Sequence, residues 1–189
     1  MSSGDPFDHA TVSYTVHEFM RACALSMTVC AKSAEATEMV SRFSHAVADA
    51  RPRSFRPRLL PALCNLEWVS DMKLAQDFRE FAHYLPWAYS PRTLDRGEEV
   101  AIVDFGSMFD MTEVLAGLMY VDAEKTYPEH NHQPRELYFL ISGAGYWRFG
   151  GNDDYRAVSA GNMLFNFPWN WHGVKAGHTP LLALYLQTH

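Results

Sequence analysis

Beyond Val100 the sequence consists of short runs of β-branched and aromatic residues separated by turn signals. The runs are VAIVDFG, TEVLAGLMYVD, ELYFLISGAGYWRFGG, MLFNFP and LLALYLQ. Such runs are typical of β-strands, and five or six of them at this spacing favour a small antiparallel sandwich or barrel. This half of the chain therefore predicts a mainly β fold.

The N-terminal half has a different pattern. Residues 13–50 contain no proline or glycine, and their apolar residues recur at intervals of three and four, which predicts one long helix or two. VSDMKLAQDFREFAHYL predicts a further helix, with Ser70 or Asp71 as its N-cap. We expect residues 1–99 to form a helical extension packed on a barrel of residues 100–189, in a single structural domain. The helices are expected either to cover the barrel or to form a homodimer contact.

Charge and hydropathy exclude several classes of partner. The chain has 189 residues and a formal net charge of −6, so it offers no general electrostatic attraction for nucleic acid or an anionic membrane. It contains no apolar run of about 18 residues, the length that a membrane-spanning helix needs. The N-terminus also lacks an apolar region behind basic residues. We therefore expect a cytoplasmic protein without nucleic-acid or membrane partners.

The stretch YPEHNHQPRELYFLISG, residues 127–143, carries several polar side chains inside a strand-like run. His130, His132, Glu136 and Tyr138 share one parity, and successive side chains of a strand alternate between its faces, so we expect all four to face one interior. Burying imidazoles and a carboxylate without partners would cost about 1–3 kcal/mol per group. A bound divalent metal removes that cost, so the stretch predicts a metal site.

A fourth ligand is expected from another strand. His172 is the candidate, because it lies eleven residues after Gly161, just past an apolar strand and a turn at Pro168. Imidazole and carboxylate ligands together suit a divalent transition metal such as zinc, iron, manganese, nickel or cobalt. The remaining histidines fall in predicted helices, loops or termini and are interpreted as surface or packing residues.

The spacing of these predicted ligands resembles the two sequence motifs of the cupin superfamily. The matching pattern is His130-x-His132-x3-Glu136-x6-Gly143, followed by Gly161 and, eleven residues later, His172. Cupins are small β-barrels with a metal in the barrel mouth. The resemblance therefore implies a cupin double-stranded β-helix, here with an N-terminal α-helical extension.

The sequence departs from the cupin motifs at three positions. Glu124 stands where the first motif usually opens with glycine, and Trp169 and Ala176 replace the usual glycine and asparagine of the second. These positions govern turns and do not ligate the metal. The departures therefore bear on loop geometry more than on metal binding.

A narrower resemblance covers nearly the whole chain. The order Tyr127-Pro128-x-His130-x-His132-x3-Glu136-x-Tyr138, with the later His172 and the helical N-terminal extension, is similar to the cupin-type dimethylsulfoniopropionate (DMSP) lyases. Members of that family cleave DMSP to dimethyl sulfide and acrylate by β-elimination, using a bound divalent metal and a tyrosine base. The resemblance implies a small sulfonium carboxylate as the substrate.

The chemistry of such an elimination suggests roles for the aromatic residues. Tyr138 follows ligand Glu136 by two residues and is predicted to be the base, although a barrel tyrosine with a hydrogen-bonded hydroxyl is the structural alternative. Tyr127 is expected to bind the carboxylate or to assist the base, if Pro128 lets it turn inward. Trp171 and Trp169 are expected to hold the sulfonium group, because aromatic faces attract cations.

Two other functions remain open at this point. Another metal-dependent cupin enzyme, such as a sugar isomerase or a dioxygenase, would share the metal ligands but would not need Tyr138 as a base. A non-catalytic cupin that senses or binds a metal or ligand would have a closed four-ligand site with no exchangeable water.

Overall fold

The computed structural model describes residues 8–93, 100–150 and 155–188. Within these ranges three α-helices lie N-terminal to the main sheets: α1 (His9–Cys30), α2 (Ala34–Asp49) and α3 (Lys73–Phe81). Residues 13–50 thus form two helices, and Ser33 begins the second by accepting a hydrogen bond from the Ala36 N–H at 3.1 Å. The predicted N-cap of α3 is wrong: Met72 holds that position, without a side-chain cap.

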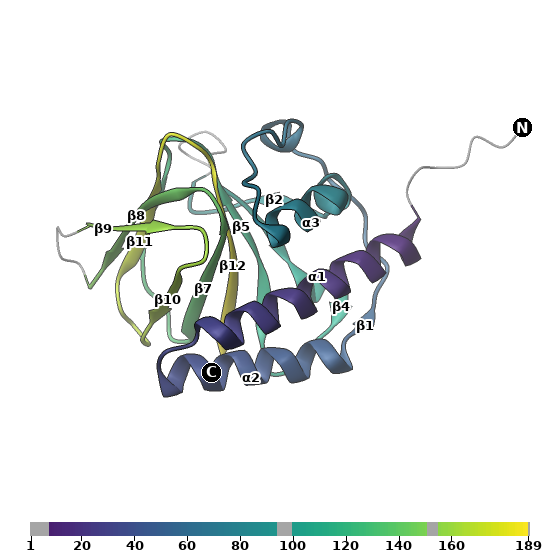
Figure 1. Cartoon of the computed structure of the whole chain (residues 1–189), viewed down its shortest axis with the longest axis horizontal. Helices are drawn as coiled ribbons and strands as arrows, with labels where there is room; N and C mark the ends of the chain where they lie inside the picture. Colours follow the sequence, from purple (N-terminus) through teal and green to yellow (C-terminus); the bar gives the residue numbers. More distant parts are fainter. Residues whose placement is uncertain (1–7, 94–99, 151–154, 189) are drawn as a thin grey trace, which may run out of the picture.

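Two antiparallel sheets make up most of the rest of the molecule (Figure 1). The six-stranded sheet has the order β10 (Met163–Asn166), β7 (Arg135–Ser142), β12 (Leu181–Thr188), β5 (Leu115–Val121), β3 (Val100–Asp104), β2 (Ala88–Tyr89). The four-stranded sheet has the order β6 (Thr126–His130), β11 (His172–Ala176), β8 (Ala144–Phe149), β9 (Tyr155–Ser159). The short strands β1 (Arg51–Pro52) and β4 (Phe109–Asp110) pair separately, and 3₁₀ turns lie at Pro61–Leu63, Ala82–Tyr84 and Phe105–Ser107.

The inner faces of the two sheets enclose a cluster that we name the barrel interior. Its buried members are Val100, Met119, Val121, Tyr127, Tyr138, Leu140, Trp147, Val158, Val174, Ala176, Leu181, Ala183 and Tyr185. They come from both sheets, so the two sheets face each other across one core. The mainly β cupin fold with an N-terminal helical extension is thereby confirmed.

A second and larger cluster, which we name the outer core, joins the helices to the outer face of the six-stranded sheet. It contains the buried side chains of α1, α2 and α3 together with Leu137, Phe139 and Ile141 of β7 and Leu182, Leu184 and Leu186 of β12. Helices α1 and α2 run antiparallel as a layer along this face (Figure 1). An ion pair of 2.9 Å between Arg135 Nη1 and Glu38 Oε2 also links β7 to α2.

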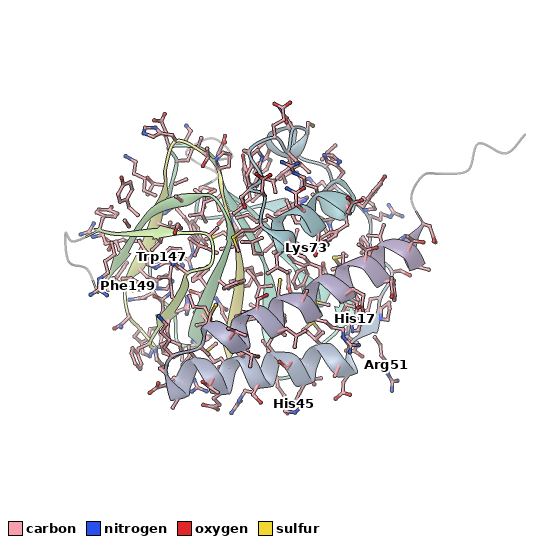
Figure 2. All side chains as sticks on the ribbon, in the orientation of Figure 1. His17, His45, Arg51, Lys73, Trp147 and Phe149 are labelled. Atoms are coloured by element: carbon pink, nitrogen blue, oxygen red, sulfur yellow. The ribbon has the colours of Figure 1, made fainter. Side chains whose placement is uncertain are left out.

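The helical layer carries some of the histidines that were interpreted as packing residues. Figure 2 shows His17 and His45 on α1 and α2, whereas Trp147 and Phe149 lie in the sheet region. The domain boundary expected at residue 99 falls in the segment 94–99, which lies outside the described residues. In the described part of the chain, no helix combines the length and the apolar character that crossing a membrane requires.

Two of the three departures from the cupin motifs have an unusual backbone. Glu124 has φ 60° and Trp169 has φ 63°, both in the left-handed region that glycine adopts most easily. An L-residue with a Cβ atom pays roughly 1–2 kcal/mol for that conformation. The turns of the cupin motifs are thus retained here without their glycines, at some cost in backbone strain.

Candidate metal centre

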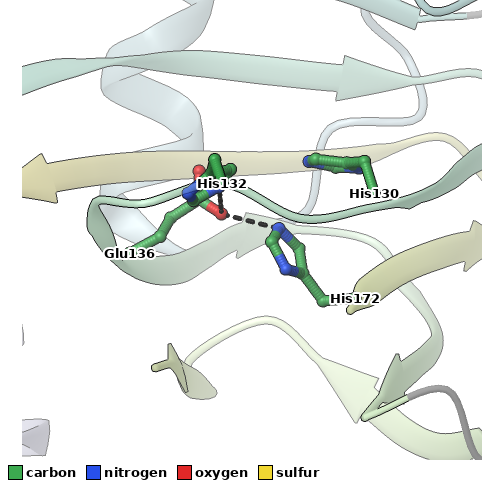
Figure 3. Close-up of side chains that lie close together, drawn as sticks. All are labelled: His130, His132, Glu136 and His172. Atoms are coloured by element: carbon green, nitrogen blue, oxygen red, sulfur yellow. Dashed lines mark hydrogen bonds and ion pairs between the residues drawn. The ribbon is translucent and has the colours of Figure 1, made fainter. Parts of the chain in front are cut away.

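Four side chains from four different segments meet at one end of the barrel interior (Figure 3). His130 ends β6, His132 lies in the turn after it, Glu136 is the second residue of β7, and His172 begins β11. Each side chain offers one ligand atom, and these atoms all lie within 4.8 Å of one another. The structure therefore brings together all four residues that the spacing predicts as ligands.

The predicted ligands do not lie on one continuous strand, as their shared parity would require. Strand β6 ends at His130, and residues 131–134 form a turn before β7 begins. In the pairing of β11 with β6, His172 lies opposite His130 and Val174 opposite Tyr127, so β6 carries one extra residue. Such a bulge changes which side chains face inward. Tyr127 and His130 therefore both point into the barrel interior despite their opposite parity.

The three histidines share one hydrogen-bonding pattern. Each Nδ1 lies 2.9–3.0 Å from a backbone carbonyl oxygen: Pro128 O for His130, Pro134 O for His132 and Asn170 O for His172. A carbonyl oxygen only accepts, so each Nδ1 carries the proton and donates. The Nε2 atoms are thereby left to face the cluster with their lone pairs, which is the tautomer that binds a metal.

Contacts within the cluster test whether a cation fits there. Nε2 of His172 lies 2.9 Å from Oε2 of Glu136, yet this buried atom makes no hydrogen bond to any residue in the described ranges. Nε2 of His132 lies 3.1 Å from the same oxygen (Figure 3). Lone pairs of imidazole and carboxylate that face each other at this range repel unless a cation or a proton lies between them. The donor set therefore fits a divalent transition metal held by His130, His132, Glu136 and His172.

Two amide side chains fix the orientation of the carboxylate. Gln187 Nε2 donates to Oε1 of Glu136 at 2.7 Å, and Asn166 Nδ2 lies 3.5 Å from Oε2. Gln187 lies on β12 directly opposite Glu136, and Asn166 lies opposite it on β10. Partners of this kind hold a ligating carboxylate in place before the metal binds.

The environment shifts the pKa values of the ligands in different directions. Burial lowers the pKa of His130 to about 4. When His132 is protonated, its Nε2–H donates to the Glu136 carboxylate, and this hydrogen bond raises the pKa of His132 above its usual value. Burial alone would raise the pKa of Glu136, but its contacts with His132, His172 and Gln187 outweigh burial and lower it. At neutral pH the carboxylate is therefore charged and His130 is neutral, the states that metal ligation requires.

A cavity of about 180 Å³ opens onto this cluster. It is lined by Arg92, Ile102, Leu115, Met119, Tyr127, His130, His132, Glu136, Tyr185 and Gln187. A larger neighbouring cavity of about 810 Å³ shares only Leu115 and Gln187 with it and contacts none of the four clustered residues. The smaller cavity has the size and the chemistry for a small polar molecule.

The two predicted catalytic tyrosines occupy different places. Tyr127 lines the cavity, and its ring centroid lies 4.7 Å from that of His130. Tyr138 is enclosed behind the cluster, with its ring centroid 4.6 Å from that of Trp147 and 6.4 Å from that of His172. Burial, followed by the charge of Glu136, raises the pKa of Tyr138 well above its ordinary value. In the metal-free chain the Tyr138 phenol therefore keeps its proton.

The two tryptophans predicted to bind the sulfonium group face outward. Trp169 and Trp171 are 60% and 49% exposed and are not among the residues that line the cavity. The backbone of Trp169 does reach the site, because its N–H donates to the carbonyl oxygen of His132 at 2.8 Å. The structure thus brings the Trp169 backbone to the cluster and leaves both indole rings outside the cavity.

Among the polar residues that line the cavity, three escaped the sequence prediction. Tyr185 and Gln187 share the inward parity of β12, a signal that the sequence LLALYLQ contains. Tyr185 can lie across β5 because residue 117 is glycine: a Cβ atom there would come within 2.6 Å of the Tyr185 hydroxyl. Arg92 lies in the loop before β3, where no sequence pattern relates it to the histidines.

Comparisons with known proteins bear on this site. The model of the dimethylsulfoniopropionate lyase family matches residues 58–183. The dimethylsulfoniopropionate lyase DddQ of Ruegeria pomeroyi is 26% identical over 93 residues, which make up 49% of this chain and 46% of DddQ. The aligned region thus spans about half the length of this curated relative.

Two solved structures share the fold over nearly the whole chain. A structure reported for the DMSP lyases RdDddP and RnDddQII has a TM-score of 0.79 at 17% identity and covers 96% of this chain and 94% of its own. The DMSP lyase DddQ from Ruegeria pomeroyi has a TM-score of 0.72 at 18% identity, covering 92% of this chain and 91% of its own. Both likenesses include the helical layer as well as the sheets.

Proposed function

Because the chain belongs to the dimethylsulfoniopropionate lyase family, we propose that it cleaves DMSP to dimethyl sulfide and acrylate at the cavity beside the metal cluster. The observation that carries the proposal is the combination of four convergent candidate ligands with the phenols of Tyr127 and Tyr185 in the adjoining cavity. Neither an isomerase nor a dioxygenase is favoured by a specific feature of this site. The proposed substrate is a small sulfonium carboxylate.

The proposed cofactor is one divalent transition metal ion, with zinc, iron, manganese, nickel and cobalt as the candidates. His130, His132, Glu136 and His172 would hold it. When bound, such an ion supplies Lewis-acid stabilisation of negative charge that develops next to the substrate carboxylate. Gln187 and Asn166 contribute by holding the Glu136 carboxylate in its orientation.

The reaction requires a base that removes a proton from the carbon next to the carboxylate. The C–H electron pair then forms the double bond of acrylate, the carbon–sulfur bond breaks, and dimethyl sulfide leaves with its electrons. We propose Tyr138 as this base, since it lies two residues after Glu136 on the same face of β7. Its pKa is raised by burial and by the Glu136 charge, and a nearby metal cation acts in the opposite direction.

Tyr127 is proposed to bind the substrate or to assist the base. It lies directly on the cavity wall beside His130, whereas Tyr138 lies behind the cluster. This placement makes Tyr127 the first phenol that a molecule in the cavity meets. Comparing Tyr138→Phe with Tyr127→Phe under the same conditions assigns the base.

The sulfonium group needs an aromatic environment without a hard anion. The role predicted for Trp171 and Trp169 requires their indole rings to turn toward the cavity, because both are about half exposed. Tyr127 and Tyr185 already present aromatic rings on the cavity wall. Alanine variants of the tryptophans that raise KM for DMSP would support a direct contact.

The experiment that tests the function is headspace detection of dimethyl sulfide from purified protein given DMSP. The protein is first stripped of metal and then reloaded separately with Mn, Fe, Ni, Co or Zn. Release that depends on metal and is lost in both His132→Ala and Tyr138→Phe supports the lyase and both roles. Protein that binds metal but releases no dimethyl sulfide with any of the five ions would overturn the assignment.

A further inference from the structure

A buried turn places one arginine at the mouth of the metal-site cavity. In the sequence SPRT, the Thr93 N–H donates to the Ser90 carbonyl oxygen at 3.0 Å, and the Thr93 hydroxyl donates to the same oxygen at 3.1 Å. The Ser90 N–H donates to the carbonyl oxygen of Val100 at 2.8 Å, which fixes the turn to β3. Ser90 and Thr93 are buried, whereas Arg92 between them is exposed. The turn therefore holds the Arg92 backbone firmly while its side chain remains accessible.

The Arg92 side chain lines the cavity and makes no hydrogen bond or ion pair with a side chain in the described ranges. A guanidinium in this position is free to donate to an anion that enters the cavity, and its planar donors match a carboxylate.

We propose that Arg92 binds the carboxylate of the substrate at the cavity mouth, and that the site thereby selects small carboxylates. The identification of the substrate as DMSP rests on the proposed function. The recognition of a carboxylate by Arg92 does not depend on it. Arg92 would be a substrate-binding residue in addition to the four predicted metal ligands and the two tyrosines.

The test compares Arg92→Gln and Arg92→Lys with the wild type, in metal-loaded full-length protein. Arg56→Gln is the matched control, because it removes one positive charge from another exposed loop. Binding of propionate and of its neutral isostere propionamide is followed by NMR titration, which needs no turnover. The KM and kcat for DMSP, the metal content and the thermal unfolding of each variant are measured alongside.

Losing a charge-assisted contact at an accessible site should weaken propionate binding and raise KM by roughly tenfold in Arg92→Gln. We expect kcat, metal content, unfolding and propionamide binding to stay close to wild type, and Arg92→Lys to recover most of the loss. Added salt should raise KM in the wild type more than in Arg92→Gln. Arg56→Gln should behave as wild type.

Propionate affinity and KM that are unchanged in Arg92→Gln would overturn the proposal. An effect on kcat alone, with propionate binding intact, would also overturn it. If no variant cleaves DMSP but propionate binding still depends on Arg92, the carboxylate site stands and the proposed lyase function fails. The two proposals can therefore fail separately.

Discussion

The outer core and the barrel interior are built on the same two strands but have different chemistry. Along β7, Leu137, Phe139 and Ile141 point to the helices, whereas Glu136 and Tyr138 point inward. Strand β12 repeats the division, with three leucines facing outward and Tyr185 and Gln187 on the inner side. The alternation of a single strand thus separates an apolar packing face from a polar reactive face.

This difference suggests how stability and function are divided. The outer core is apolar, so its contribution to folding comes from burying hydrocarbon. The end of the barrel interior that holds the histidine and glutamate cluster buries charged and polar groups, which cost free energy unless a partner compensates them. We therefore expect substitutions on the outer face to change stability and substitutions on the inner face to change metal binding and turnover.

The largest effect is expected for His172→Ala. Removing a direct ligand should lower metal affinity by more than about 100-fold, because substitutions that only touch the partners of ligands already cost about 10- to 100-fold. Dimethyl sulfide release should fall below detection, while the thermal unfolding of the metal-free protein changes little. Metal content by mass spectrometry and headspace analysis check this. A variant that keeps full metal content would remove His172 from the ligand set.

Phe139→Ala tests the other face of the same strand as Glu136. Phe139 is 1% exposed in the outer core, so truncation should lower the free energy of unfolding by about 3–5 kcal/mol. Metal bound per folded molecule should stay unchanged. Urea unfolding and metal analysis at low temperature measure both quantities. Loss of metal at full stability would contradict the proposed division between the faces.

Acid should destabilise the metal-free protein through the interior. The pKa of His130 is about 4 when folded and 6.5 as an unperturbed group, so between these values the unfolded chain binds a proton that the folded chain does not. Stability therefore falls as pH drops through this window, by about 3 kcal/mol from this group at most. The pKa of Glu136 is also lowered, so its contribution to the stability of the protein is lost as pH falls below the pKa of the unfolded group. The pKa of His132 is raised, so protonation of His132 favours the folded state and opposes this loss.

Urea unfolding of the metal-free protein at pH 7, 6, 5 and 4 measures this loss, and His130→Gln supplies the control. The variant lacks the titrating imidazole, so its stability should depend less steeply on pH between 6.5 and 4. Equal slopes in both proteins would show that burial of His130 does not govern the acid response.

The smallest effect is expected for Gln187→Leu. This change removes the 2.7 Å hydrogen bond to Glu136 and leaves the ligands in place, so metal affinity should fall by about tenfold. Gln76→Leu is the matched control, because Gln76 donates to the Ser70 carbonyl oxygen away from the site. Competition with a metal chelator measures both variants. A Gln76 variant that loses as much affinity as the Gln187 variant would indicate a general structural effect.

The four predicted ligands come together in the structure because their spacing along the chain tolerates changes in the local backbone. His130, His132, Glu136 and His172 meet although His132 lies in a turn and not in a strand. The inward position of Tyr127 depends on a bulge opposite β11, and bulges have no reliable sequence pattern. Pro128 was the only local sign of it.

Other parts of the site depend on tertiary contacts that a sequence does not contain. Arg92 reaches the cavity through a turn tied to β3, far from the ligands along the chain. The aromatic residues near His172 predict a role for Trp169 and Trp171, yet both indole rings face outward beside the left-handed turn at Trp169. Similarly, the break between α1 and α2 is set by the Ser33 cap within a continuously helical pattern.

The left-handed turn at Trp169 gives the protein an intrinsic optical probe. The Trp169 N–H donates a hydrogen bond to the His132 carbonyl oxygen, and the Trp169 indole ring is 60% exposed to solvent. A shift of His132 on metal binding would therefore change the surroundings of this fluorescent ring. Trp87 and Trp147 are buried and provide emission at shorter wavelength. Loading of the metal centre should therefore be visible in the fluorescence of the unlabelled protein, in real time and without substrate.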